Sequence, residues 1–157
     1  PTMKSLDADK KVSKTTNSTS EAAPEKEEVI DFSKVKVEPL FEEFVDFDTF
    51  SKSDFRAVKV KACEAVKKSK KLLQFTLDCG EAQPRTILSG IRKWYSEPEK
   101  LIGRTVVIAA NLAPRKIAGI ESQGMILSSI TDDGEGETLS MLTVMEPESI
   151  PGGSEIG

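Results

Sequence analysis

Hydrophobic and polar residues alternate along a stretch that begins at Phe55, FRAVKVKACEAV. A period of two is typical of a β-strand with one buried face, since successive side chains point to opposite sides. The alternation places Val58, Val60 and Ala62 on the predicted core face and leaves Cys63 on the outer face. This stretch therefore predicts the first strand of a sheet.

The same pattern continues in the next two stretches. In LLQFTLDCG, the positions Leu73, Phe75 and Leu77 share one face, and the preceding lysine-rich KKSKK (Lys67–Lys71) reads as a polar turn. RTILSGI predicts a third strand, in which Gly90 marks a bulge. These stretches extend the predicted sheet to three strands.

A short helix is predicted after the third strand. Ser96 and Glu99 have the spacing of a capping box, in which each side chain bonds the backbone N–H of the other residue. Pro98 suits the first helical turn, and Gly103 suits a helix end. The expected helix spans residues 96–102.

TVVIAANL predicts a fourth, near-continuous apolar strand, which is followed by the segment Asn111–Met125 and MILSSI, and LSMLTVM (Leu139–Met145) predicts one more strand. The fold class predicted is all-β. Five main strands with one helix between the third and fourth favour a five-stranded Greek-key barrel of the OB type over a sandwich, and such barrels bind oligonucleotides on one face.

The flanks of this region differ in composition. Residues 1–28 are rich in Lys, Ser, Thr, Glu and Ala without periodicity, which predicts a disordered segment. We expect a flexible linker over residues 1–44 and the folded domain over residues 45–157, with Phe50 and Phe55 packing at its entry. No apolar run suits a signal peptide or a membrane span, so a cytoplasmic protein without membrane contact is expected.

Charge is unevenly distributed along the 157 residues. Between Lys52 and Ile130, 15 Lys and Arg stand against 7 Asp and Glu, whereas the whole chain carries a net charge of −4. A basic middle between acidic flanks indicates a surface for a polyanion.

Several kinds of chemistry are excluded or disfavoured. The chain contains no histidine, which rules out Ser-His and Cys-His nucleophile arrangements. Cys63 and Cys79 are expected to be reduced thiols, and two cysteines are too few for a zinc site of the usual kind. No catalytic residue, metal or cofactor is therefore predicted.

The segment NLAPRKIAGIESQGM (Asn111–Met125) carries the candidate binding chemistry. Pro114 restricts the backbone, so Arg115 and Lys116 are expected at a rigid loop edge, where they can bind phosphates. Asn111 and Ser122 can bond a phosphate or a ribose hydroxyl.

Two further residues of that segment complete the candidate group. Gly124 permits close backbone approach, and Met125 offers a soft apolar platform for an exposed base. Each residue has a structural alternative: a solvated loop for the charges, a turn for Asn111 and the core for Met125. Packing is also the alternative to base stacking for Trp94 and Tyr95.

Four blocks together resemble a known family: FDTFSKSDFRAVKV, KLLQFTLDCG, RTILSGIRKWYS and LIGRTVVIAANLAPRKIAGIESQGMIL. They are similar, in order, to the tRNA-binding domain at the C-terminus of methionyl-tRNA synthetases. The same domain occurs in free tRNA-binding dimers, in endothelial monocyte-activating polypeptide II and in an export chaperone. The resemblance covers roughly residues 45–145.

What the resemblance implies is an OB-fold without catalytic activity that recognises tRNA by shape and backbone and raises the tRNA affinity of a tethered or associated aminoacyl-tRNA synthetase. The implied tRNA-binding positions are Asn111, Arg115, Lys116, Ser122 and Met125, with support from Ser89, Arg92 and Lys71. The lysine-rich turn and the acidic TDDGEGET after Ile130 depart from the family pattern.

Three matters stay open at this level. A peptide-binding chaperone on the same fold is the alternative function, and a free-standing tRNA-binding or synthetase-associated cofactor is the alternative form. The resemblance also implies a homodimer, and FVDFDTF and LSMLTVM are the segments expected to form its interface.

Overall fold

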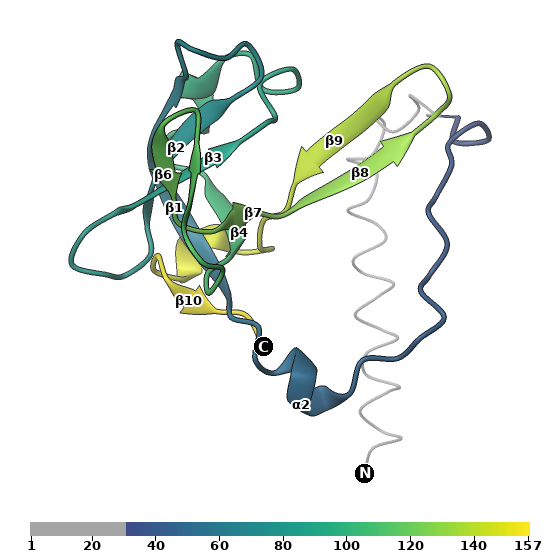
Figure 1. The fold of residues 1–157 in the computed structure, drawn as a ribbon, viewed down its shortest axis with the longest axis horizontal. Helices are drawn as coiled ribbons and strands as arrows, with labels where there is room; N and C mark the ends of the chain where they lie inside the picture. Colours follow the sequence, from purple (N-terminus) through teal and green to yellow (C-terminus); the bar gives the residue numbers. More distant parts are fainter. Residues whose placement is uncertain (1–30) are drawn as a thin grey trace, which may run out of the picture. The chain divides into compact units, whose positions relative to one another are not determined.

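The computed structural model describes residues 31–157, and these form a mostly β structure (Figure 1). The predicted disordered segment, residues 1–28, lies outside the described residues. The elements, in chain order, are α2 (Phe47–Phe50), β1 (Phe55–Ala65), β2 (Leu73–Asp78), β3 (Arg85–Ser89), the 3₁₀ helix η2 (Pro98–Leu101), β4 (Thr105–Ala109), β5 (Arg115–Ile117), β6 (Ile120–Ser122), β7 (Met125–Ile126), β8 (Ser128–Asp132), β9 (Glu137–Met141), the 3₁₀ helix η3 (Pro147–Ser149) and β10 (Ser154–Glu155).

The main sheet is antiparallel and has the order β3-β2-β1-β4-β7, with β10 paired to β1. The order β4-β1-β2-β3 is that of a Greek key, because β4 returns to lie beside the first strand of a three-stranded meander. The strongly curved sheet, drawn in blue and green, bends back on itself (Figure 1). The predicted all-β, barrel-like OB architecture is confirmed.

The core follows the predicted alternation most closely in β2 and β4. Leu73, Phe75 and Leu77 are completely buried on the inner face of β2. All five residues of β4 are buried, as expected for a continuous apolar strand between two neighbours. Burial of these side chains is the main force that holds the sheet closed.

In β1 the predicted alternation is wrong beyond Val60. The pairing of β1 with β2 shifts register between Val60 and Ala62, which is a β-bulge. A bulge adds one residue and so exchanges the two faces of the strand beyond it. Consequently Ala62 is exposed, and Cys63 is buried in the core. Burial raises the pKa of the Cys63 thiol to about 12, so it stays protonated and unreactive.

Two local predictions near β3 and the helix also need correction. Gly90 follows the last residue of β3 and makes no bulge. The helix occupies the predicted slot but is a four-residue 3₁₀ turn that starts after Glu97, with no side-chain capping bond, so the Ser96–Glu99 capping box is wrong. Pro98 begins this turn, and burial of Leu101 holds it against the barrel.

The predicted last strand lies outside the main sheet. Only Leu139–Met141 of LSMLTVM is extended, within β9, and β9 pairs with β8 in a separate hairpin. The apolar stretch MILSSI is divided between two strands, because β7 pairs with β4 whereas β8 belongs to that hairpin (Figure 1).

The C-terminal strand β10, which was not predicted from the sequence, pairs with part of β1 instead. It is reached through Gly153, whose φ of +97° and close packing against Cys79 leave no room for a Cβ.

At the outer edge of β3, polar groups of residues 122 and 123 replace a strand ladder and close the barrel. The Ser122 hydroxyl accepts the Leu88 N–H at 3.0 Å. The Gln123 side-chain oxygen accepts the Thr86 N–H at 3.0 Å, while the Gln123 N–H donates to the Thr86 carbonyl at 2.8 Å. These bonds satisfy backbone groups that an open sheet edge would leave unpaired.

The segment before β1 exposes many apolar side chains. Asp46 caps α2 by accepting the Thr49 N–H at 3.0 Å. Phe50 packs against Phe55 with ring centroids 6.1 Å apart, which confirms the predicted packing at the domain entry. Phe41 and Phe44, by contrast, are 93% and 99% exposed. Among residues 31–157, no helix has the length and apolar character needed to cross a membrane.

Replacing Ser122 by alanine is expected to lower the free energy of unfolding by about 1–3 kcal/mol, because the Leu88 N–H loses its buried acceptor. Ser96→Ala is the matched control: it is exposed and caps nothing, so its effect should stay within about 0.5 kcal/mol. Urea unfolding of both variants measures the difference. A loss for Ser122→Ala as small as that expected for Ser96→Ala would contradict the closure, whereas a loss for Ser96→Ala as large as that expected for Ser122→Ala would restore the capping box.

Candidate nucleic-acid interface

Most of the predicted binding motif lies on the site loop, which we define as residues 110–124 between β4 and β7. Within it, β5 and β6 form a hairpin whose turn residues Ala118 and Gly119 have φ of +52° and +81°. Two consecutive residues with positive φ are the mark of the tight hairpin turn that matches strand twist. The hairpin therefore projects as a rigid unit rather than as an irregular loop.

Strand alternation separates the two predicted phosphate ligands. Arg115 and Ile117 lie on one face of β5, and Lys116 lies on the other. Across the hairpin, Arg115 faces Ser122 whereas Lys116 faces Glu121. A carboxylate opposite Lys116 offsets part of its charge, so Arg115 is the stronger cation of the pair toward an anion.

A cavity of about 460 Å³ lies beside this hairpin; we call it the loop cavity. Four of the eight predicted site residues border it: Ser89, Arg115, Ser122 and Met125. The remaining walls are mostly apolar and come from Leu72, Leu88, Leu112, Ala113 and Ile117, with Gly90 and Gly124 completing the lining. The structure thus gathers half of the predicted set around one hollow.

Arg115 and Met125 present free groups at the loop cavity. The Arg115 side chain is exposed and forms no hydrogen bond or ion pair with any residue in the described part of the chain. Met125 is 50% exposed because its neighbour Ile126 takes the inward position of β7. Met125 is therefore a surface residue of the cavity and not part of the core.

Asn111 and Ser122 use their polar groups inside the protein. The Asn111 side chain accepts the Asp54 N–H at 3.0 Å and donates to the Lys52 carbonyl, so it fixes the segment that enters β1. Ser122 is only 2% exposed, and its hydroxyl closes the barrel edge. Through these bonds both residues hold the loop in place.

The close backbone approach expected at Gly124 occurs within the protein. Gly124 has φ of +132°, and a Cβ at this position would lie 2.8 Å from the Ala109 carbonyl oxygen. The glycine therefore lets the end of the site loop pass directly over β4.

Lys71 and Arg92 lie in an adjoining basic region. Lys71 borders a hollow of about 240 Å³, the lysine hollow, together with Lys70, Gly90, Lys93 and Trp94. The Arg92 N–H donates to the Lys71 carbonyl at 3.2 Å, so the two predicted residues are neighbours. Gly90 borders both hollows, and the basic region thus continues from the loop cavity.

Trp94 and Tyr95 take structural positions. The Trp94 indole N–H donates to the Glu137 carbonyl at 3.0 Å, and the Tyr95 hydroxyl accepts the Met141 N–H at 3.0 Å. Both rings are partly buried against the core. They tie β9 to the barrel, which favours the packing alternative over base stacking.

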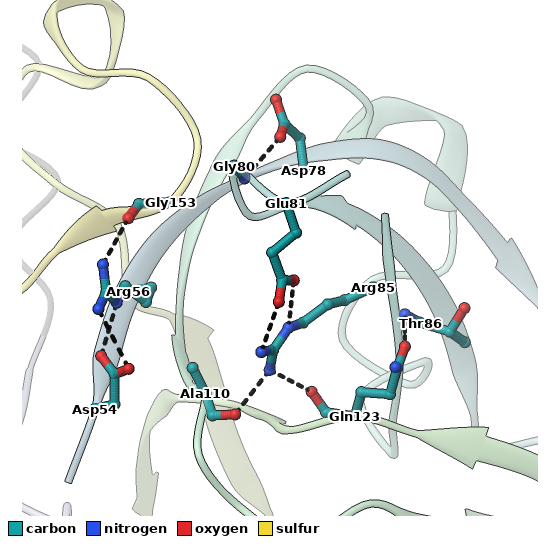
Figure 2. A network of polar contacts seen from close by, with 10 residues as sticks. All are labelled: Asp54, Arg56, Asp78, Gly80, Glu81, Arg85, Thr86, Ala110, Gln123 and Gly153. Atoms are coloured by element: carbon teal, nitrogen blue, oxygen red, sulfur yellow. Dashed lines mark hydrogen bonds and ion pairs between the residues drawn. The ribbon is translucent and has the colours of Figure 1, made fainter. Parts of the chain in front are cut away.

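Arg85, which was not among the predicted residues, clamps both ends of the site loop (Figure 2). Its guanidinium donates to the Ala110 carbonyl at 2.7 Å and to the Gln123 carbonyl at 3.1 Å. Glu81 holds the other side of the guanidinium in a bidentate pair at 2.7 and 3.1 Å. The bonds from Arg85 hold the pKa of the Glu81 carboxyl below its usual range.

The residues missed in the sequence fall into two groups. Arg85 and Gln123 act through contacts distant in sequence, which no local pattern reveals. Ile117, in contrast, follows Arg115 by two residues in a β-stretch, so alternation alone places it on the same face.

Residues 55–154 match the family model described as "Putative tRNA binding domain". The chain is 56% identical over 90 residues to a methionine–tRNA ligase of Deinococcus radiodurans, a match that covers 57% of this chain and 13% of the ligase. The chain thus spans a small part of the length of that curated relative.

Two solved structures have a similar fold. A MetRS-related protein from Pyrococcus horikoshii is 36% identical, with a TM-score of 0.65, and the match covers 73% of this chain and 99% of that one. The chaperone CsaA from Bacillus anthracis is 24% identical with a TM-score of 0.59, covering 73% of this chain and all of that one, which shows a shared fold.

Arg85→Gln is expected to leave the barrel folded but to loosen the site loop, with a loss of about 1.5–3 kcal/mol of stability from its charged hydrogen bonds. Amide hydrogen exchange should become faster across residues 111–121 and change little in β2. Arg104→Gln, an exposed arginine with no side-chain bond among the described residues, is the control. Exchange in the site loop that matches the unmodified chain would contradict the clamp.

The clamp should also weaken in acid. Because its pKa is lowered in the folded protein, ionised Glu81 contributes to the free energy of unfolding at neutral pH. This contribution is lost as the pH falls through the lowered pKa. Glu81→Gln should remove this part of the pH dependence.

Proposed function

The chain belongs to the family of tRNA-binding domains, and on this basis we propose that it binds folded tRNA through the site loop and the adjoining lysine hollow. The observation that carries the proposal is the exposed Arg115 side chain, which has no partner among the described residues and lies at the rim of an apolar cavity. A guanidinium held on a rigid hairpin suits a phosphate oxygen. The domain performs no chemistry of its own.

The proposed contacts divide into three kinds. Arg115, Lys116, Lys71 and Arg92 contact phosphates, since they are cations on the basic surface. Met125 and Ser89, which border the loop cavity, contact a base or a ribose. Asn111 and Ser122 act indirectly, by fixing the site loop through their bonds to backbone groups.

Recognition of this kind depends on shape and backbone rather than on sequence. Phosphate contacts set the position of a protein on RNA and carry no base information. Between Lys52 and Ile130, the excess of eight positive charges supplies long-range attraction for any tRNA. We therefore expect similar affinity for different tRNAs.

The domain is the C-terminal appendix of a cytoplasmic methionyl-tRNA synthetase in this proposal. A tethered binding module raises the local concentration of tRNA near the catalytic part, so it increases affinity without a new catalytic contact. The similarity to a ligase over 13% of its length supports a tethered form. The similarity that spans 99% of the Pyrococcus chain supports a free-standing form as the alternative.

A peptide-binding chaperone is the second candidate function. The apolar walls of the loop cavity favour it, because a hydrophobic side chain of a peptide would also be buried there. The basic surroundings favour RNA instead. The two functions differ in salt dependence, since apolar contacts are not weakened by salt in the way that phosphate contacts are.

A homodimer is part of the proposal. Phe41, Phe44 and Met145 are more than nine-tenths exposed, and they lie in or next to the two segments expected to pair. A monomer rarely leaves so many large apolar side chains in water, and an interface between two copies would cover them.

Charge reversal at Arg115 tests the tRNA site. About four phosphate contacts predict a loss on the order of 10²-fold in affinity between 50 and 200 mM salt. Arg115→Glu should weaken binding to several tRNAs about equally and flatten the slope of log K against log salt by at least roughly 0.7–0.9. Titration of labelled tRNA at several salt concentrations measures both quantities.

Arg104→Glu is the matched control, because it changes the net charge equally at an exposed arginine outside both hollows. It should shift affinity much less than Arg115→Glu. Absence of tRNA binding at 50 mM salt would overturn the proposed function. An unchanged slope for Arg115→Glu would overturn the site.

Sedimentation equilibrium tests the dimer at micromolar concentration. The unmodified chain should sediment as about twice its mass of 17.1 kDa. Phe44→Glu should give monomers, because it places a charge in the proposed apolar interface. Ile102→Glu, at a half-exposed apolar residue outside the two segments, should stay dimeric. A single 17.1 kDa species for the unmodified chain would remove the dimer from the proposal.

A further inference from the structure

The loop cavity combines features that are typical of a small-ligand site. Its volume of about 460 Å³ lies within the range of about 300–1,000 Å³ typical of small-ligand sites. Leu112 and Met125 stand at its rim with 47% and 50% of their surface exposed. Apolar side chains held half in water around a preformed hollow gain free energy when a flat apolar group covers them.

The polar groups around the cavity are few and stand at its edge. The exposed Arg115 side chain lies at the rim, and alternation along β5 places Ile117 on the same side, against the cavity. Ser89 also borders the cavity, and its hydroxyl forms no hydrogen bond to any described residue. An apolar interior with one cation and one hydroxyl at the edge matches a ring that carries polar edges and is attached to a phosphate.

Charge around the cavity separates a nucleotide from an apolar peptide. The lysine hollow continues from the cavity across Gly90 and adds Lys70, Lys71 and Lys93. Glu121, the carboxylate on β6, pairs in register with Lys116 and so lies on the face of the hairpin away from Arg115. An extended cationic surface beside an apolar hollow would attract a chain that alternates phosphates and rings.

We propose that the loop cavity holds one unpaired base of the bound RNA, with the phosphate of the same nucleotide on Arg115. The inference rests on the proposed tRNA-binding function and assigns the ligand of its central hollow. Unpaired bases in RNA loops can be turned outward and buried against apolar or aromatic side chains. Because the walls are apolar, the cavity accepts different bases and reads the presence of an unpaired base rather than its identity.

This arrangement predicts a part of the affinity that salt does not remove. Phosphate contacts determine the slope of log K against log salt, whereas burial of a base contributes equally at each salt concentration. The two parts can therefore be separated by substituting uncharged and charged residues of the same site.

The test uses the double variant Leu112→Ala/Met125→Ala of the full chain, which is titrated with tRNA at salt concentrations from 50 to 200 mM. Loss of the two rim side chains should weaken binding about tenfold or more at every salt concentration while the slope stays unchanged, as expected for removal of contacts to one base. Met125→Leu should retain affinity, since it preserves an apolar wall. Ile102→Ala is the matched control, because Ile102 is also 50% exposed but does not border the cavity.

A second measurement examines the cavity without tRNA. Methyl NMR spectra of the full chain are recorded with guanosine monophosphate, with inorganic phosphate and with an unstructured apolar peptide. The nucleotide should shift the methyl signals of Leu112, Ile117 and Met125 and leave Ile102 unmoved, whereas phosphate alone should leave all of these methyl groups unmoved. The double variant should lose the nucleotide-induced shifts.

The outcomes distinguish the inference from the function on which it rests. If the unmodified chain fails to bind tRNA at 50 mM salt, the proposed function is wrong. The nucleotide spectra alone then show whether the cavity binds a base. If tRNA binds the double variant as tightly as the unmodified chain, the base site is overturned while the function stands. Peptide shifts in the cavity without nucleotide shifts would overturn the base site in favour of the chaperone alternative.

Discussion

The outer edge of β3 sets the constraint on which the rest of the structure depends. On that side β3 forms no regular strand pairing, and Ser122 and Gln123 supply the hydrogen-bond partners that another strand would otherwise provide. Closure through two side chains and the Gln123 N–H needs only two residues. The chain before them is therefore free to leave the sheet, form the β5–β6 hairpin and present cations to solvent. A full strand at this edge would satisfy the same groups but would leave no projecting hairpin.

That constraint explains why half of the recognisable motif is structural. Ser122 and Gly124 lie where the loop rejoins the barrel, and Asn111 lies where it departs. Arg85 then bonds the carbonyls at both ends, so the loop is defined by its two fixed ends. A short loop held in this way loses little conformational entropy when a ligand binds, since most of its order is already present in the free protein.

Sequence reasoning succeeded where local pattern and burial agree. Alternation in β2 and the continuous apolar run of β4 predicted their buried faces, because the neighbouring strands impose nothing that contradicts the local period. It failed at Ala62 and Cys63, since a bulge is set by pairing with β2 and not by the residues themselves. The capping box failed because Pro98 starts a turn too short for a helix. For the candidate site, the cations were predicted from residue type, but the apolar walls from Leu72 and Leu88 come together only through the barrel.

Satisfied charge and free charge near the site loop belong to two different arginines, Arg85 on β3 and Arg115 on β5. Arg85 is an arginine near the same loop, yet its guanidinium is bonded to Glu81 and to two carbonyls, so it contributes order and little attraction. Arg115 faces an uncharged residue across the hairpin, and its charge is therefore available. The Arg85 guanidinium cannot hold the loop and bind a phosphate at the same time, because its bonds inside the protein must be broken before a phosphate can use the same donors. The division of labour between two arginines thus gives the loop rigidity without reducing its positive potential. In the proposed base site, the same division leaves Arg115 free at the rim of the apolar cavity to hold the phosphate of the nucleotide whose base lies inside.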